Sequence, residues 1–259
     1  MTLIASRDNP RVRRWRYLTR DARVRRDLQR VLIEGEHLVS TCLQAGRVLE
    51  ALLLSKSAST KTEIMKVAAK TGVSPVILAD SVFNSIADTG SPTGIAAEIA
   101  LLPQKTDLKE SKSCVLLEGI QDAGNVGTIL RSAAAFGIGH AVLGKGCADA
   151  WSPKVLRAGM GAHFAIEIVE QADLVEAAER FGGKLACTVP RGGIELRDAD
   201  LSGRIGWLLG AEGRGVSDAL AACAALKVTI PMPGGAESLN VAAAAVICFY
   251  ELSRRGARA

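Results

Sequence analysis

A polar, glycine-rich stretch in the middle of the chain has the residue types of a ligand-binding turn. It reads EGIQDAGNVG at positions 118–127 and leads into a helical pattern that carries Arg131. Its glycines let a ligand or another backbone come close, and Asn125 suits a helix N-cap. An ordinary turn needs no arginine at 131, whereas a forked guanidinium can bind phosphate or stabilise a developing negative charge.

Two further glycine-rich stretches follow towards the C-terminus. LGAEGRGV at 209–216 surrounds the single carboxylate of Glu212, and IPMPGGAESLN at 230–240 offers Ser238 and Asn240. The acidic residue in the first argues against a phosphate cradle, and the Gly-Lys-Ser/Thr of a Walker A loop is absent, so a cationic or neutral ligand fits better. In the second, Ser238 is the expected N-cap of a long terminal helix, and capping alone would explain it.

Each stretch follows an apolar run typical of a strand buried on both faces. Six such strands are expected in the second half of the chain: 114–117, 141–143, 165–169, 185–189, 205–209 and 228–230. Helical periods lie between them, which predicts a parallel α/β sheet flanked by helices. Open sheets of this kind bind ligands at the carboxyl ends of their strands, where the three stretches begin.

The first half of the chain predicts a smaller α/β domain. Apolar runs at 31–34, 49–54, 75–78 and 94–101 alternate with helical periods. The polar stretch that follows contains Pro103 and no apolar period, which is typical of a linker. We therefore predict domains at 1–102 and 114–259, joined by a linker at 103–113.

Positive charge is concentrated at the N-terminus. Residues 1–30 hold ten arginines against three aspartates, a net charge of +7, so the remainder of the chain carries −2 of the total +5. With Trp15 and Tyr17 among them, these arginines offer donors for phosphates and rings for bases. We predict RNA contacts at Arg11, Arg13, Arg14 and Arg16. A solvated helix face or a basic tail would explain the same composition.

Composition excludes several classes of protein. No apolar run approaches the roughly 20 residues that span a bilayer, so no membrane segment is expected. The arginine-rich start does not look like a secretory signal, which predicts a cytoplasmic protein. The six cysteines are widely spaced and are expected to be reduced core residues, and no metal site is expected. A nicotinamide-dependent oxidoreductase would need a complete Gly-x-Gly-x-x-Gly turn, which Gly137-Ile-Gly139 does not provide.

Taken together and in this order, the three stretches resemble the motifs of the SpoU (TrmH-type) family of RNA ribose 2′-O-methyltransferases, within the knotted SPOUT superfamily. The resemblance rests on Asn125 and Arg131 in the first motif, Glu212 in the second, and Ser238 and Asn240 in the third. It is strong over residues 114–255, and residues 1–100 look more loosely like an L30e-like substrate-binding domain. Two positions depart from the family pattern: Ala211 stands where Asn is usual, and Ala123 replaces a common Pro.

The resemblance implies a C-terminal domain with a deep trefoil knot, S-adenosylmethionine as cofactor, and a homodimer whose subunits complete each other's active sites. It implies catalytic roles for the five motif residues just named, with Arg131 as the central one. The implied cofactor-binding residues are Leu209, Gly210, Glu212, Gly213, Ile230, Met232, Ser238 and Leu239. The expected substrate is RNA, with rRNA favoured over tRNA. Because Ala211 departs from the pattern, an inactive RNA-binding protein with a methyltransferase-like domain is the alternative.

Overall fold

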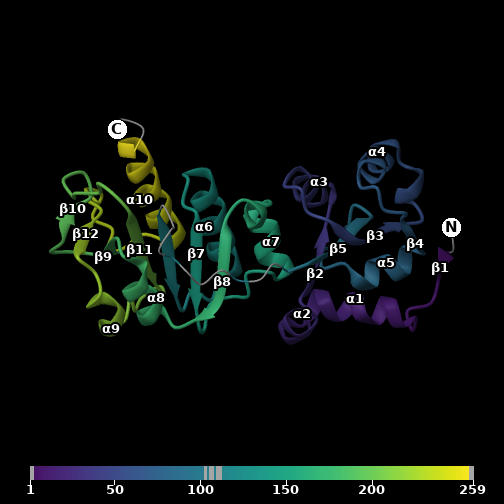
Figure 1. The fold of residues 1–259 in the computed structure, drawn as a ribbon, viewed down its shortest axis with the longest axis horizontal. Helices are drawn as coiled ribbons and strands as arrows, with labels where there is room; N and C mark the ends of the chain where they lie inside the picture. The colour runs from purple at the N-terminus through teal and green to yellow at the C-terminus, as the bar shows by residue number, and fades with distance from the viewer. Residues whose placement is uncertain (1–2, 102–103, 105–107, 109–112, 257–259) are drawn as a thin grey trace. The chain divides into compact units, whose positions relative to one another are not determined.

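The computed structural model describes residues 3–101, 104, 108 and 113–256, and it divides the chain into two compact units (Figure 1). The first contains residues 1–103 together with 151–164, and the second contains residues 104–150 and 165–259. The second unit therefore begins at residue 104, and the first unit is made of two separate stretches of the chain. The segment 151–164 lies within the predicted second domain in sequence, yet it packs in the first unit.

The first unit is built on a five-stranded mixed sheet in the order β1-β4-β3-β5-β2. Its strands are β1 (Leu3–Ile4), β2 (Arg30–Glu34), β3 (Leu49–Ser55), β4 (Val76–Leu78) and β5 (Ile95–Ala100). Strands β1, β4 and β3 pair in parallel, and β5 runs antiparallel to both β3 and β2. Strands β2 to β5 match the four predicted apolar runs, whereas the two-residue β1 is too short to give a pattern.

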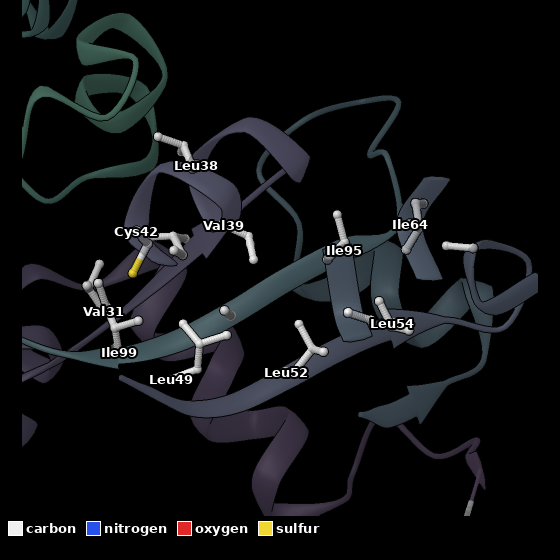
Figure 2. Packing of buried hydrophobic residues seen from close by; sticks show 14 of the residues in the cluster. Val31, Leu38, Val39, Cys42, Leu49, Leu52, Leu54, Ile64, Ile95 and Ile99 are labelled. Carbon is white, nitrogen blue, oxygen red and sulfur yellow. The ribbon is translucent and has the colours of Figure 1, made fainter. Parts of the chain in front are cut away.

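Helices cover both faces of this sheet because alternate strand residues point to opposite sides. They are α1 (Pro10–Arg20), α2 (Ala22–Leu28), α3 (Glu36–Gln44), η1 (Ala58–Thr60), α4 (Thr62–Lys70) and α5 (Asp80–Ile86). On β3, Leu52 and Leu54 pack with residues of α3 and α4, as Figure 2 shows in part. Ala51 and Leu53 pack on the other side with residues of α1 and α5.

The segment 151–164 forms α7 (Pro153–Gly159) and η2 (Ala162–Phe164). Leu156 is 1% exposed and belongs to the same core cluster as Val31 and Val39. The guanidinium of Arg157 lies 2.7 Å from the carboxylate of Asp88. The Nε2 atom of His37 lies 3.1 Å from the main-chain oxygen of Met160. These contacts make the segment a structural part of the first unit.

The second unit contains a seven-stranded sheet in the order β10-β12-β9-β11-β6-β7-β8, in which every neighbouring pair is parallel. Its strands are β6 (Cys114–Glu118), β7 (His140–Gly144), β8 (Glu167–Ala172), β9 (Lys184–Thr188), β10 (Ile194–Glu195), β11 (Ile205–Gly210) and β12 (Leu226–Thr229). This confirms the predicted parallel α/β sheet. The six predicted strands are present, and the two-residue edge strand β10 is an addition.

Four helices pack on this sheet: α6 (Ala123–Ala135), α8 (Leu174–Phe181), α9 (Asp218–Ala221) and α10 (Val241–Gly256). Leu116 and Leu208 share a core cluster with Leu174, Phe181 and Leu220 of α8 and α9. Helices α6 and α10 pack against each other and contact β7 and β11 (Figure 1). Among the described residues, no helix is both long and apolar enough to cross a membrane.

Part of the predicted linker 103–113 lies outside the described residues. Two of its described residues contact the second unit. Leu108 is 1% exposed within the cluster beneath α8, and its carbonyl accepts a hydrogen bond from Arg204 at 2.7 Å. The side chain of Gln104 accepts a hydrogen bond from the main-chain N–H of Glu170. At these positions the chain is anchored to the second unit.

All six cysteines are free thiols, as predicted, and four of them are buried. Burial raises the pKa of Cys42 to about 11, and those of Cys114 and Cys248 to about 12. These thiols therefore stay protonated at neutral pH and behave as small apolar core residues.

Candidate active site

Two central strands of the second unit end side by side and bring the first two glycine-rich stretches together. Strands β6 and β11 pair in parallel, with Glu118 opposite Gly210 in the last register position. Both strands stop there, and Gly119 turns the chain at a φ of +65°. A Cβ atom on Gly119 would lie 3.7 Å from Cβ of Ala211, so the two turns touch.

The loop after β11 is a tight turn that requires glycine. The main-chain N–H of Gly215 donates to the carbonyl of Ala211 at 2.8 Å, which closes the loop on itself. A Cβ atom on Gly210 would lie 1.9 Å from the carbonyl oxygen of Gly215, so no larger residue fits without moving the loop. The main-chain N–H of Ser217 donates to Glu118 at 2.7 Å and fixes the loop's far end. This closure holds Glu212 at the tip, exposed to solvent.

The three predicted polar residues Asn125, Glu212 and Asn240 form one hydrogen-bonded cluster. The side-chain amide of Asn125 donates to Oε1 of Glu212 at 2.7 Å. The side-chain amide of Asn240 donates to the same oxygen and to Oδ1 of Asn125, both at 3.0 Å. Residues separated by up to 115 positions are thereby joined across the first turn of α6, the loop after β11 and the start of α10. Through its amide, Asn240 joins the start of α10 to the loop after β11.

The helix caps differ from those predicted. Helix α6 begins at Ala123, and its N-cap is Asp122, whose carboxylate accepts from the N–H of Asn125 at 2.8 Å. Asn125 therefore lies inside the first turn, where its side chain is free to bind Glu212. Similarly, Oδ1 of Asn240 accepts from the main-chain N–H groups of Ala242 and Ala243, so Asn240, and not Ser238, caps α10.

Arg131 lies two turns beyond Asn125 on α6 and is exposed. Within the described part of the chain, it makes no hydrogen bond and no ion pair, so its guanidinium is available to a ligand. A carboxylate such as Glu212 could hold this arginine or an arginine of a second subunit. In the single chain, Glu212 binds the two asparagine amides instead.

The predicted cofactor residues fall into two groups. Leu209 lies buried in β11 and Gly210 ends that strand, while Glu212 and Gly213 lie in the loop that follows. The remaining residues lie after β12, where Ile230 and Met232 are half-buried and Ser238 and Leu239 are exposed. No described residue accepts a hydrogen bond from the main-chain N–H of Met232 or Leu239. Main-chain donors that no described residue engages fit a ligand such as S-adenosylmethionine, which offers several acceptor atoms.

The sequence analysis missed three neighbours of this site: Glu118, Asp122 and Cys147. The expected strand 114–117 stops one residue before Glu118, and the sequence favours Asn125 over Asp122 as the N-cap. The thiol of Cys147 donates to the carbonyl of Leu117 at 3.2 Å, and burial raises its pKa, which argues against a nucleophilic role. Asp122 could have been found from the sequence, because an aspartate just before a helical period is a typical helix N-cap.

The four predicted RNA-binding arginines of α1 have different surroundings in the first unit. The Arg14 guanidinium pairs with the buried Glu98, and Arg16 donates to the carbonyl of Arg7 at 3.1 Å. Arg11 and Arg13 are exposed, and Arg11 lies 5.1 Å from the centre of the Trp15 ring.

The expectation that Trp15 presents its ring to RNA is wrong. Trp15 is 0% exposed, and its indole N–H donates to Glu98 at 2.7 Å. Its position on the same helix stripe as Val12 and Leu18 turns it into the core of the first unit. Tyr17 remains exposed and is the ring on α1 that a base could reach.

Comparisons with known proteins agree with this geometry. Residues 112–250 match the model of the SpoU rRNA Methylase family, and residues 9–97 match the MRM3-like substrate binding domain. The chain is 33% identical to the 23S rRNA (guanosine(2553)-2′-O)-methyltransferase RlmP of Bacillus subtilis, over 97% of this chain and 99% of that protein. It is 37% identical to human mitochondrial rRNA methyltransferase 3, over 56% of this chain and 36% of that protein.

Solved structures show the same fold over nearly the whole chain. An AdoMet-bound rRNA methyltransferase from Sinorhizobium meliloti superposes with a TM-score of 0.85 at 27% identity, covering 98% of each chain. The SpoU methyltransferase AviRb from Streptomyces viridochromogenes, in complex with AdoMet, superposes with a TM-score of 0.83 at 25% identity, covering 97% of this chain and 100% of that one. These likenesses confirm the predicted activity, S-adenosylmethionine-dependent methylation of a ribose 2′-hydroxyl in RNA, with rRNA favoured over tRNA. The chain belongs to the SpoU rRNA methylase family.

Proposed function

We propose that this protein methylates a ribose 2′-hydroxyl in the RNA of the large ribosomal subunit. The proposal is supported by the similarity to RlmP, which extends over almost the full length of both chains and includes both units. The observation that carries it is the Asn125–Glu212–Asn240 cluster, which draws the three glycine-rich stretches into one site.

Arg131 is the residue we assign to the reacting oxygen. Methyl transfer requires a ribose hydroxyl that is held in line with the donor and that loses its proton. A guanidinium stays protonated under physiological conditions, so it stabilises the developing negative charge or a neighbouring phosphate more readily than it removes a proton. It is exposed and binds no described residue, which leaves its donors free for this task.

The other motif residues divide into two roles. Asn125, Glu212 and Asn240 already bind one another, so we assign them to positioning of the loops around the substrate. The exposed hydroxyl of Ser238 has no hydrogen-bond partner among the described residues and can bind the ribose or its phosphate. S-adenosylmethionine, when bound, supplies an electrophilic methyl group. The loop after β11 and the segment 230–239 would hold it through main-chain donors.

We further propose a homodimer formed through α6 and α10. Helix α10 exposes Ala243, Ile247 and Tyr250 along one stripe, and the Ile247 and Tyr250 side chains are 37% and 54% exposed. The Tyr250 ring packs edge-on against Phe136, just after α6, at a centroid distance of 6.0 Å. An apolar stripe on the helix pair that carries Arg131 is suited to a second copy of the chain, which would complete the active site. The trefoil knot and a cytoplasmic location remain predictions.

The test is methyl transfer to large-subunit rRNA taken from cells that lack the gene, with the modified nucleotide mapped afterwards. We expect incorporation at a single ribose, dependent on S-adenosylmethionine and strongly reduced by Arg131→Ala. Small-subunit rRNA and tRNA from the same cells serve as comparison substrates. Preferential methylation of tRNA, or methylation of a base, would contradict the proposal. Light scattering tests the dimer, which Tyr250→Asp should dissociate.

A further inference from the structure

A basic hollow lies on α1 in the first unit. It has a volume of about 490 Å³ and is lined by Arg13, Arg16, Tyr17, Arg20 and the turn Asp21–Ala22. The four lining residues of α1 follow the spacing i, i+3, i+4 and i+7, which places them on one face of the helix. The opposite face, with Val12, Trp15 and Leu18, is buried.

The charges of this hollow are not neutralised by the fold. Within the described residues, no carboxylate lies within ion-pair distance of Arg13, Arg16 or Arg20. Arg20 makes a single long contact of 3.5 Å to the carbonyl of Ser85. The carboxylate of Asp21 is occupied as the N-cap of α2, where it accepts from the main-chain N–H groups of Arg23 and Val24.

Other arginines of the first unit, in contrast, are paired with carboxylates. Arg14 and Arg30 lie within 4.0 Å of the buried carboxylate of Glu98, and Arg30 also pairs with Glu50 at 3.2 Å. Burying a carboxylate is costly unless it is paired, so these two arginines have a structural task. No comparable task explains Arg13 and Arg20.

An aromatic ring lies among the unpaired cations. Tyr17 is 52% exposed, and its hydroxyl has no hydrogen-bond partner among the described residues. Flat rings interleaved with cations are how proteins bind single-stranded nucleic acid, because bases stack on the rings while cations follow the phosphates. An acidic protein segment would use the cations but would gain little from an exposed ring.

We infer that this hollow binds a single-stranded segment of the RNA substrate, with Arg13 and Arg20 contacting phosphates and Tyr17 stacking on an unpaired base. The inference rests on the proposed function and assigns the substrate contact to a particular face of α1. Arg11 and Arg14, which were also predicted to contact RNA, lie outside the hollow. Arg16 lines it but is partly engaged by the carbonyl of Arg7.

The test compares the full-length protein with Arg13→Gln/Arg20→Gln. The matched control is Arg23→Gln/Arg26→Gln, which removes two exposed arginines from α2 and changes the net charge equally. The probe is oligo(U) of roughly 12 nucleotides, within the usual site size for single strands. Losing two phosphate contacts should weaken binding and make the salt slope of log affinity shallower by about 1.4. The control should keep nearly the parental slope.

Tyr17 is tested separately because base stacking depends less on salt concentration than the phosphate contacts of arginine do. Tyr17→Ala should weaken oligo(U) binding about 5- to 150-fold with little change in slope, and Tyr17→Phe should retain most of the affinity. Tyr17→Ala should not change the affinity for a duplex RNA of equal length, because the bases of a duplex are paired and cannot stack on the ring. Equal losses in the α2 control would overturn the inference in favour of diffuse charge. Polyglutamate binding with the same dependence on Tyr17 would overturn it in favour of an acidic protein partner.

Failure of the inference can be told apart from failure of the proposed function. If the parent methylates large-subunit rRNA while Arg13→Gln/Arg20→Gln keeps its oligo(U) affinity and slope, the hollow is not the contact. If the parent methylates no rRNA but the variant loses oligo(U) binding as expected, the hollow binds RNA and the proposed substrate is wrong.

Discussion

Helix α1 of the first unit and the strand-end loops of the second both contain polar residues that the sequence predicts to be functional, but their contacts in the structure differ. In the loops, Asn125, Glu212 and Asn240 come from distant stretches and bind one another. On α1, Arg14 is used to neutralise a buried carboxylate, and Arg16 binds the main chain. Arginine is suited to both structural and ligand-binding work, so its presence alone says little. A polar residue just after a parallel strand is a better indicator of a functional site, because the topology of the sheet places the ends of neighbouring strands together.

A second difference lies in how the two units are assembled from the chain. The first unit needs the segment 151–164, which is separated in sequence from the rest of it by strands β6 and β7 of the second unit. The following predictions test whether residues act in the unit where the structure places them.

The largest effect is expected for Arg131→Ala in the second unit. The variant should fold and bind S-adenosylmethionine like the parent, because the exposed guanidinium contacts no partner in the described part of the chain. Methyl transfer should fall by about 100- to 1,000-fold, the usual loss when a donor to a developing negative charge is removed. Steady-state assays and calorimetry measure the two quantities.

Two companion variants sharpen this result. Arg131→Lys should be nearly as impaired, because lysine lacks the two-pronged donor geometry. Arg180→Ala, which removes an exposed arginine from α8, should retain parental turnover. Parental turnover in Arg131→Ala would remove this residue from the mechanism.

Leu156→Ala should weaken the first unit although the residue lies within the sequence of the methyltransferase domain. Removing a fully buried leucine typically costs about 2–5 kcal/mol of unfolding free energy. Amide hydrogen exchange should therefore accelerate in β2 and β5, with β6 and β11 unaffected. The matched change Leu208→Ala should show the opposite pattern, since Leu208 is in the core of the second unit. Loss of protection in β6 and β11 of Leu156→Ala would contradict the assignment.

Glu98→Ala should destabilise the first unit by roughly 1–3 kcal/mol, because the buried indole N–H of Trp15 loses its acceptor. Chemical denaturation followed by tryptophan fluorescence measures the change. Glu50→Ala breaks an exposed pair with Arg30 and should cost about 0–1 kcal/mol. Equal costs for the two would mean that the Glu98 cluster has no special structural role.

Asn240→Ala is expected to destabilise the second unit less than Glu98→Ala destabilises the first. This change removes the N-cap of α10 and should cost about 1 kcal/mol. Ser238→Ala should leave stability unchanged, because the Ser238 hydroxyl caps nothing. Thermal unfolding of both variants decides between the two residues as the cap. A larger shift for Ser238→Ala would restore the cap predicted from the sequence.

Much of the fold could be predicted because burial leaves a periodic pattern. The central strands β6 and β11 are largely apolar runs, and α6 begins shortly after β6, at Ala123. The missed strands β1 and β10 have two residues each, too few for any period. The predicted N-caps of α6 and α10 lie two or three residues from the observed ones. Several residue types that favour an N-cap stand close together at both places, and the local sequence does not decide which of them starts the helix.

The sequence by itself determined the parallel sheet, the three glycine-rich stretches and the motif residues, because residue type and strand-end position are local properties. Tertiary structure alone decided which polar groups meet. It placed Trp15 in the core with Glu98, brought Asn240 to Asn125 and Glu212, and attached 151–164 to the first unit. These outcomes depend on contacts between residues that are far apart along the chain, and a local pattern carries no information about which distant partner a side chain will find.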